Sequence, residues 1–337
     1  MRECHLSLLV CPECQAALAL SQSEPGDGDR IRSGTLTCVS CHAAFPIIDH
    51  IPRFVSSDNY ARNFGLEWTR HARTQYDSHS GATVSEDRFF KETGWPRDLA
   101  GEHLLEVGSG SGRFTEQAAK TGAMVVSFDF SFAVEANYAS NGHKANVLIV
   151  QADLLKMPLR RGFFDKLYCF GVLQHTPDVR SSFLSLPPML KPGGDLCVDV
   201  YSKKVWWVEL LVKGRWIRPL TRHLPPHLLY ALVNRYVRLM WPLATQINKL
   251  PLGMHINLAL LVADYRGHFD LSEEMLKEWA ILDTFDLLSA YYDQPQTVKT
   301  LQQWFEEAGL DDIRVHLGFN GIEGHGKAPQ AVRRSYR

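Results

Sequence analysis

The sequence predicts an α/β fold built around a mainly parallel sheet, with a four-cysteine module before the sheet and a helical insertion within it. Short apolar runs alternate with helix-length segments across residues 101–202, a pattern typical of strands that are joined by crossover helices. A glycine-rich turn follows the first of these runs, and two Cys-x-x-Cys pairs precede all of them. Residues 313–324 read as a final hairpin, which would complete a seven-stranded sheet.

The composition is that of an ordinary globular protein. The chain of 337 residues allows two or three domains, and 45% of its residues are hydrophobic and 22% charged. A net charge of −1 gives no general attraction to nucleic acid, and no apolar run reaches the roughly 18 residues of a membrane-spanning helix. The apolar stretch at residues 6–10 is too short for a signal peptide, and seven cysteines, four of them paired, suit a reducing compartment. We therefore expect a cytoplasmic protein.

The most informative stretch joins a strand, a tight turn and the start of a helix. The apolar run at residues 104–107 contains Glu106 and leads into Gly108-Ser109-Gly110-Ser111-Gly112. Glycines leave the backbone N–H groups at the helix start open to a ligand. Arg113 stands where the dinucleotide-binding pattern has its last glycine, and a carboxylate such as Glu106 suits a cationic ligand group rather than a phosphate. The pattern favours S-adenosylmethionine, which has an amine and no phosphate.

Two further acids follow the next two predicted strands. Asp129 ends the strand over residues 124–128, where a carboxylate can accept hydrogen bonds from ribose hydroxyls. Asp153 follows the strand over residues 147–150 and could accept a hydrogen bond from the adenine amino group. The predicted cofactor-binding residues are Glu106, Gly108, Gly110, Gly112, Asp129, Phe130, Asp153, Leu154 and Phe170.

Two more motifs follow, residues 164–170 and the Leu-Lys-Pro-Gly-Gly turn at residues 190–194. All of these motifs stand in the order found in class I S-adenosylmethionine-dependent methyltransferases. Residues 101–202 resemble that family, in particular its type 11, ubiquinone-biosynthesis-like members. The resemblance implies a Rossmann-like, seven-stranded methyltransferase sheet with a cofactor-binding core. Pro187 and Pro188 depart from the family pattern, in which a helix runs straight into the turn, so we expect a shortened or kinked helix there.

Four cysteines predict a zinc ribbon over residues 1–57. Cys11, Cys14, Cys38 and Cys41 have the spacing CxxC-x23-CxxC, and four thiolates can surround Zn²⁺ as a tetrahedron. A polar module of about 55 residues needs such a staple, and four thiolates leave no open metal position, so we expect the zinc to be structural. The module is similar to the small ribbon that is fused to, or activates, some methyltransferases. Either it caps the catalytic domain or it recognises a partner.

Residues 58–100 are expected to form a helical connector that covers the cofactor or packs on the core. Phe64, Trp68 and Tyr76 are predicted to share one face of a helix there.

Residues 203–270 are predicted to form a basic, tryptophan-rich helical insert. Residues 203–249 hold nine lysines and arginines and one acid, a net charge of +8, and four of the eight tryptophans. This composition suits contact with an anionic membrane or a lipid-like acceptor, although a packed subdomain or nucleic-acid contact would also fit. We predict a lid over the acceptor side of the crevice, with peripheral contact at the inner face of the membrane. Residues 271–326 would complete the sheet, and residues 327–337 would form a disordered tail.

His175 is the candidate general base. It follows the fourth predicted strand, whose carboxyl end faces the ligand crevice, and an imidazole pKa can be poised near neutral. It could instead bond to the backbone or pack near the cofactor. The candidates for the acceptor pocket are Asp283, Asp286, Tyr291 and Tyr292, for which helix capping and surface exposure are equal explanations.

Together these features predict a methyltransferase that acts on a small-molecule, lipid-linked or glycan acceptor, at oxygen or carbon, by in-line transfer. The alternative is an RNA methyltransferase that uses the ribbon to recognise its substrate. The near-zero net charge argues against it, as does Phe170-Gly171-Val172-Leu173 in place of an Asn-Pro-Pro-Tyr-like amino-methylating motif. A third hypothesis is a non-enzymatic subunit that keeps the cofactor for structure.

Overall fold

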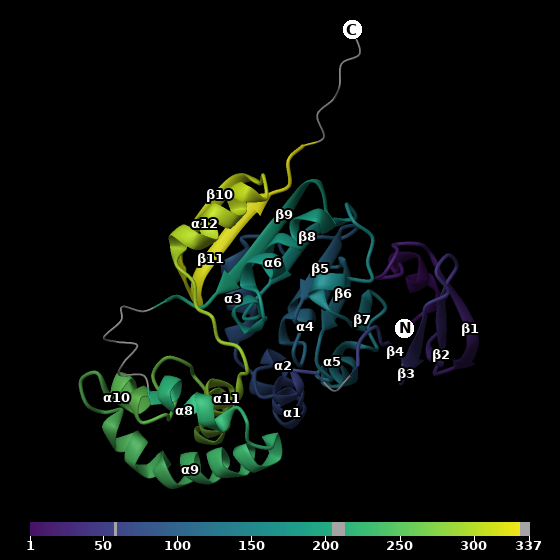
Figure 1. Ribbon diagram of the computed structural model, residues 1–337. Coiled ribbons are helices and arrows are strands. Elements are labelled where there is room, and N and C mark those ends of the chain that lie inside the picture. Colours follow the sequence, from purple (N-terminus) through teal and green to yellow (C-terminus); the bar gives the residue numbers. More distant parts are fainter. Residues whose placement is uncertain (57–58, 204–212, 331–337) are drawn as a thin grey trace.

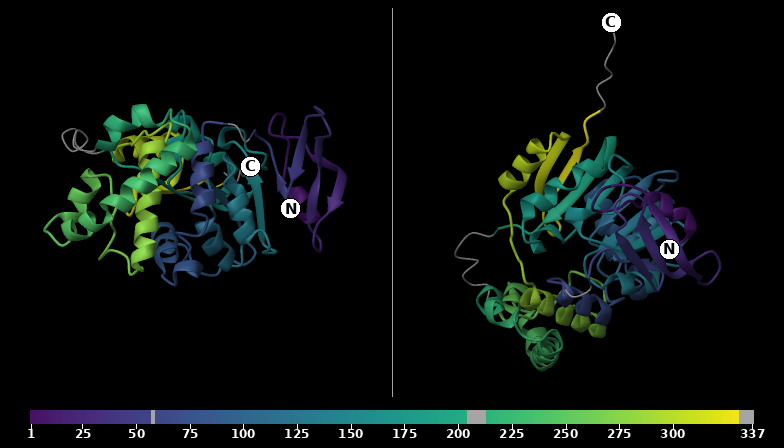
Figure 2. Two further views of the ribbon diagram at one scale, coloured as in Figure 1. Left: turned by 90° about the horizontal axis from the view of Figure 1, so that it is seen from below. Right: turned by 45° about the vertical axis from the view of Figure 1, so that its right-hand side comes forward.

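The computed structural model describes residues 1–56, 59–203 and 213–330, with the side chains of residues 213–215 left out (Figure 1). The molecule has three parts, which are the N-terminal ribbon, a central sheet and a helical lobe. The ribbon lies beside one edge of the sheet, and the lobe lies below the ends of the central strands in the view of Figure 1. Figure 2 shows the ribbon and the lobe from two further directions.

The ribbon is a four-stranded antiparallel sheet that follows a short 3-10 helix, Glu3–Leu8. A tight turn joins the first two strands, and Gly28 in it has a φ of +67°, which glycine adopts without steric cost. The strands lie in the order β1-β2-β3-β4. Their bounds are β1 (Leu18–Pro25), β2 (Ile31–Cys38), β3 (Ala44–Ile48) and β4 (Ile51–Pro52).

The central sheet has seven strands in the order β10-β11-β9-β8-β5-β6-β7, which confirms the predicted fold class. The five strands from β5 to β9 run parallel, and β11 runs antiparallel to both of its neighbours. The parallel strands are apolar and almost wholly buried, as strands covered on both faces must be. The bounds are β5 (His103–Val107), β6 (Met124–Asp129), β7 (Val147–Gln151), β8 (Phe164–Cys169), β9 (Leu190–Val200), β10 (Asp311–Gly318) and β11 (Gly321–Lys327).

Helices cover both faces of this sheet. One face packs against α3 (Val84–Thr93), α4 (Arg113–Lys120) and α5 (Val134–Asn141). The other packs against α6 (Val179–Leu184) and α12 (Val298–Glu307), whose core continues into the ribbon. The helix α6 ends before the two prolines, and the 3-10 turn Pro187–Met189 leads into β9, so the expected shortening is present.

The helical lobe has a core of its own. Buried side chains recur at every fourth residue of α9 (Pro226–Ile247), from Leu229 to Trp241, and pack against α11 (Glu273–Ser289). The N-terminus of α11 is capped by Ser272, whose hydroxyl accepts a hydrogen bond from the backbone N–H of Met275. The remaining lobe helices are α1 (Arg62–Arg70), α8 (Lys213–Thr221) and α10 (Gly253–Ala259), whereas the short α2 (Asp77–Ser80) packs against α3.

The ribbon covers β7, the outermost parallel strand of the central sheet. Directly after β4, the backbone N–H of Phe54 donates to the carbonyl oxygen of Gln151 at 2.9 Å. The guanidinium of Arg53 donates to the Gln151 side chain at 3.0 Å and forms an ion pair with Glu135 on α5. Backbone and side-chain bonds therefore hold the ribbon against this edge.

Two sequence expectations need comment here. Tyr76 does not share a helix with Phe64 and Trp68, because α1 ends at Arg70; its hydroxyl donates to the carbonyl oxygen of Ser111 instead. Within the described ranges, no helix combines the length and the apolar character needed to cross a membrane.

The predicted tail over residues 327–337 falls mainly on residues 331–337, which lie outside the described part, as do Trp206 and Trp207 of the insert. Lys327 still belongs to β11. Ala328 exchanges backbone hydrogen bonds with Gly193 and Gly194 of β9.

Candidate functional site

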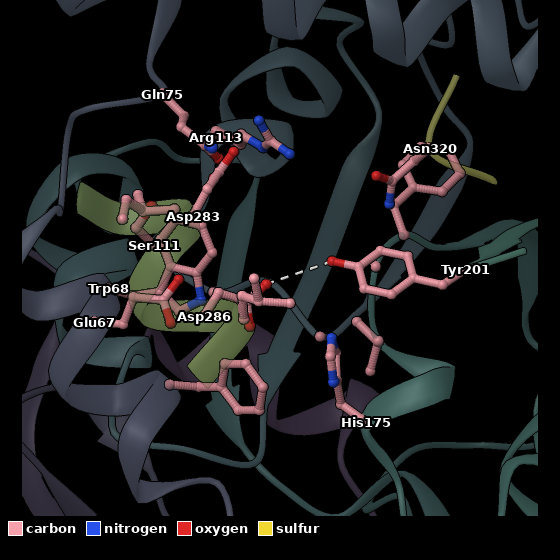
Figure 3. Close-up of a pocket in the computed structure, with 18 of the residues that line it drawn as sticks. Glu67, Trp68, Gln75, Ser111, Arg113, His175, Tyr201, Asp283, Asp286 and Asn320 are labelled. Atoms are coloured by element: carbon pink, nitrogen blue, oxygen red, sulfur yellow. Dashed lines mark hydrogen bonds between the residues drawn. The ribbon is translucent and has the colours of Figure 1, made fainter. Parts of the chain in front are cut away.

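A cavity of about 720 Å³ lies between the carboxyl ends of the parallel strands and the helical lobe (Figure 3). The glycine turn and the ends of β6, β7 and β8 form its sheet side, and α1, α10 and α11 form its lobe side. Ligands of such sheets bind outside the carboxyl ends of the strands. The volume lies within the roughly 300–1,000 Å³ of small-molecule sites. The cavity is therefore the candidate active site.

The glycine turn has a shape that side chains would not permit. Gly108, Gly110 and Gly112 have φ values of +78°, +52° and +93°. A Cβ atom on Gly108 would lie 2.2 Å from the side chain of Val172, and one on Gly112 would lie 2.1 Å from that of Asn137. Gly108 and Gly110 line the cavity, whereas Gly112 lies behind them at the start of α4. The turn thus presents bare backbone to the cavity.

Asp129 joins the end of β6 to this turn. Its carboxylate accepts hydrogen bonds from the backbone N–H of Gly110 at 2.9 Å and from the backbone N–H and hydroxyl of Ser131 at 2.8 and 2.7 Å. Burial raises the pKa of this carboxyl above its usual value. Asp129 also lines the cavity, so its fixed carboxylate is presented to a ligand.

The other predicted cofactor-binding residues divide into two groups. Phe130, Asp153, Leu154 and Phe170 all line the cavity together with Asp129. The Asp153 carboxylate also caps a short 3-10 turn by accepting a hydrogen bond from the backbone N–H of Leu155 at 2.9 Å.

Glu106 is placed differently, because it does not line the cavity. Its side chain is buried beneath the glycine turn and accepts hydrogen bonds from the hydroxyls of Thr115 and Ser127. Burial raises the pKa of this carboxyl to about 7. The residue therefore links β5, α4 and β6 under the turn and is not brought together with the other cofactor candidates.

His175 stands at the sheet side of the cavity with a defined orientation. Its Nδ1 lies 2.9 Å from the carbonyl oxygen of Tyr292. A carbonyl oxygen can only accept, so Nδ1 carries the proton and the lone pair is on Nε2. The ring packs against Phe64 and meets Tyr201 edge to face, with centroids 5.0 and 5.4 Å away. This arrangement fixes the orientation of the ring, and in the neutral tautomer Nε2 is the acceptor.

Of the four acceptor-pocket candidates, the two aspartates line the cavity. Asp283 accepts a hydrogen bond from the hydroxyl of Tyr265 at 2.6 Å, and Asp286 accepts one from Tyr201 at 3.4 Å (Figure 3). Burial raises the pKa of Asp283 to about 7, and that of Asp286 is raised as well.

The two tyrosines lie outside the cavity lining. Tyr291 is 40% exposed and packs under the guanidinium of Arg222. Tyr292 packs against Tyr60 and contributes its backbone carbonyl to His175, which is a positioning contact.

Several cavity residues were missed by sequence reasoning. Glu67 neighbours Trp68 on α1, and both line the cavity beside Arg113. The helical pattern that marked Trp68 carried no signal for a buried acid next to it. Tyr201 and Asn320 come from the end of β9 and the β10–β11 turn, which meet only because β11 pairs with β9.

The four cysteines of the ribbon form a second candidate site. Their sulfur atoms lie within 4.8 Å of one another, with Cys11 and Cys41 3.6 Å apart and Cys14 and Cys38 3.4 Å apart. Zn–S bonds of about 2.3 Å in a tetrahedron place sulfurs roughly 3.8 Å apart. Four sulfurs at this spacing fit a structural zinc ion and leave no position for a substrate.

Two segments match known protein families. Residues 105–198 match the model of the methyltransferase domain, and residues 3–49 match that of Trm112p-like proteins. The chain contains a methyltransferase domain. The resemblance inferred from the glycine turn, the two acids and the paired cysteines is thereby confirmed, as is a cofactor-binding fold of this class.

Ubiquinone biosynthesis O-methyltransferases are among the curated relatives. The protein from Xanthomonas oryzae pv. oryzae is 30% identical over 120 residues, which cover 35% of this chain and 50% of the relative. That from Coxiella burnetii is 33% identical over 109 residues, or 31% and 46% of the two chains. The chain thus spans about half the length of the curated relatives it matches.

Among solved structures, a complex that contains the Haloferax volcanii Trm112 methyltransferase activator aligns with a TM-score of 0.44 and 12% identity. The alignment covers 82% of this chain and all of the matched chain.

Proposed function

We propose that the protein is an S-adenosylmethionine-dependent methyltransferase that methylates a hydroxyl group of a small or lipid-linked acceptor. The observation that carries the proposal is the cavity, which has the glycine turn and Asp129 on one wall and His175 with two buried aspartates on the others. The matched methyltransferase domain covers the first of these walls. One cavity therefore offers a cofactor side and an acceptor side.

The residues present fit the cofactor. The open backbone of Gly108 and Gly110 suits close approach of its methionine part, the carboxylate of Asp129 suits the ribose hydroxyls, and Asp153 suits the adenine amino group. When bound, S-adenosylmethionine supplies a methyl group on a positively charged sulfur, which is already activated for transfer.

The contribution of the chain is alignment, exclusion of water and removal of a proton. The Nε2 lone pair of His175 can accept the hydroxyl proton of an acceptor, while the carbonyl of Tyr292 holds the ring through Nδ1. The positive imidazolium that results is stabilised by Asp286, whose charge interacts with His175 across the cavity. This geometry suits an oxygen acceptor, because the hydroxyl proton can pass to Nε2 as the oxygen takes the methyl group from the sulfur.

A methyl-transfer assay tests this proposal. Protein is incubated with tritium-labelled cofactor and with the small-molecule, lipid and RNA fractions of a cell extract. We expect label in the small-molecule or lipid fraction, and His175→Gln should lower the rate by roughly 100-fold at unchanged cofactor affinity. His143→Gln, at an exposed position after α5 and away from the cavity, is the matched control. Label confined to RNA, or cofactor binding without transfer to any fraction, would refute the assignment.

We also propose that α9 rests on an anionic membrane surface. Its outer face carries four leucines that are 45% to 76% exposed, and their helical spacing puts Arg235 in the same stripe and Arg238 beside it. An exposed apolar stripe with basic residues suits an interfacial helix. Since α10 lines the cavity and adjoins α9, an acceptor carried by a lipid would reach the cavity from this side. The leucines are Leu228, Leu232, Leu239 and Leu243.

A further inference from the structure

Three carboxyl groups gather on the lobe side of the cavity. Glu67 comes from α1, and Asp283 and Asp286 come from neighbouring turns of α11 (Figure 3). We call them the carboxyl cluster. Asp286 and Asp283 both raise the pKa of Glu67 beyond the effect of its burial, so the three groups are close enough to interact.

The carboxyl cluster has more hydrogen-bonding capacity than the protein uses. Glu67 is 1% exposed, and among the residues that the structure describes neither its Oε2 nor Oδ1 of Asp286 has a hydrogen-bond partner. Within the described ranges, none of the three carboxyls forms an ion pair with a lysine or arginine. Buried carboxyl oxygens without partners are costly and rare in folded proteins. Their position on a cavity wall indicates that a ligand provides the missing partners.

A guanidinium in the cavity offsets part of the negative charge of the carboxyl cluster. Arg113 lines the same cavity, and its charge acts on Asp283. A second cation at the cluster would meet this guanidinium. The pKa of Asp283 is raised to about 7 by burial, so at neutral pH this carboxyl is protonated in part of the molecules. It can then donate as well as accept, which matches a hydroxyl group, whereas an ammonium only donates.

The walls beside the carboxyl cluster supply flat apolar surfaces. Trp68 stands next to Glu67, and Tyr265, Phe269 and Trp279 stand next to Asp283. Phe269 and Trp279 stack on each other with ring centroids 5.0 Å apart. Aromatic rings beside buried carboxyls suit a ligand that has an apolar face and a polar rim, as the ring of a sugar has.

We propose that the carboxyl cluster is the acceptor-binding subsite and that it recognises a polyhydroxylated, sugar-like ring through neighbouring hydroxyl groups. The inference rests on the proposed methyl transfer and names its substrate class. Glu67 and Asp286 pair with hydroxyls of the ring, the aromatic walls hold its apolar face, and a further hydroxyl is directed toward Nε2 of His175. Asp283 keeps its bond to Tyr265, and its protonated form donates to a further hydroxyl of the ring.

A binding experiment with defined probes tests the proposal. The probes are methyl glycosides of hexoses, deoxyhexoses, uronic acids and pentoses, with spermidine and tyramine as amine probes. Saturation-transfer NMR is recorded on protein saturated with S-adenosylhomocysteine. We expect signals from the ring protons of at least one glycoside and none from spermidine. Glu67→Gln and Asp286→Asn should each weaken that glycoside by roughly tenfold, with unchanged affinity for S-adenosylhomocysteine.

The control variant is Glu274→Gln, a solvent-exposed acid on α11, which should leave glycoside binding unchanged. Three results would overturn the proposal. They are binding of an amine probe in place of the glycosides, no saturation-transfer signal from any glycoside, and an equal loss of binding in the control variant. Failure of the proposed methyl transfer shows separately, because the protein would then bind no cofactor product or would label no fraction in the transfer assay.

Discussion

Replacing Asp283 by asparagine is expected to make the ligand-free protein more stable at neutral pH. The carboxyl lies on α11, faces the cavity and keeps one strong hydrogen bond, from the hydroxyl of Tyr265. An asparagine side-chain oxygen can accept the same bond. What the substitution removes is an acid whose ionised form is disfavoured first by burial and then by the neighbouring Asp286, with Arg113 offsetting part of the effect.

The size of the effect follows from proton linkage. The pKa of Asp283 is raised from 3.8 to about 7 in the folded protein, so between these values the folded state holds a proton that the unfolded state has released. The wild-type free energy of unfolding then falls by about 1.4 kcal/mol for each pH unit in this window. Over the whole window the loss is on the order of 4 kcal/mol. The variant lacks this loss, so its advantage should grow from about pH 4 to pH 7 and then stay constant.

Urea unfolding of ligand-free protein at a series of pH values between about 5 and 8 measures this difference. Glu278→Gln is the matched control on the same helix, because Glu278 accepts hydrogen bonds from His71 and Thr74 that lower its pKa. A lowered pKa contributes stability that is fully present above the unfolded value of 4.5, so the control should be less stable than wild type by a constant amount across this pH range. A constant difference between Asp283→Asn and wild type across this range would refute the reasoning.

Three further predictions concern the ribbon, the cofactor wall and α9. Purified protein should contain about one zinc per chain. Cys11→Ser should lose the zinc and loosen the ribbon, whereas Cys4→Ser should do neither. Elemental analysis measures the zinc and proteolysis measures the loosening, and zinc-free wild type would exclude the metal. Asp129→Ala should weaken S-adenosylmethionine binding by roughly 1.5–3 kcal/mol, or one to two decades, in calorimetric titration; unchanged affinity would remove Asp129 from the site. Replacing Arg235 and Arg238 by glutamate should reduce sedimentation with anionic vesicles at unchanged cofactor affinity. The reason is that each basic residue contributes about 1 kcal/mol to binding an anionic surface. Wild type that stays in the supernatant at low salt would contradict the membrane proposal.

The sequence predicted those features that depend on neighbouring residues. The strand before Asp129, the turn at Gly108 and the spacing of Cys11 and Cys38 are local patterns, and the structure places each of them as the pattern indicates. Where a side chain points depends on residues far along the chain. Glu106 precedes the glycine turn but points beneath it, because Thr115 on α4 and Ser127 on β6 both donate to its carboxylate.

The acceptor side was harder to predict for the same reason. Asp283 and Asp286 are three residues apart, so both face the cavity from one side of α11, whereas Tyr291 and Tyr292 follow the end of that helix and turn away from it. Glu67 joins the aspartates only because α1 packs against α11, although more than 200 residues separate them in the sequence. No local pattern in the sequence carries that contact.

The ribbon also shields one edge of the central sheet from pairing with other chains. Without it, β7 would be the free rim of a seven-stranded sheet, with backbone groups open to pairing with another chain, and such rims promote aggregation. Phe54 and Arg53 occupy this rim with backbone and side-chain bonds to Gln151. If four thiolates and a zinc ion hold the ribbon in shape, zinc supply governs how much of the protein escapes aggregation.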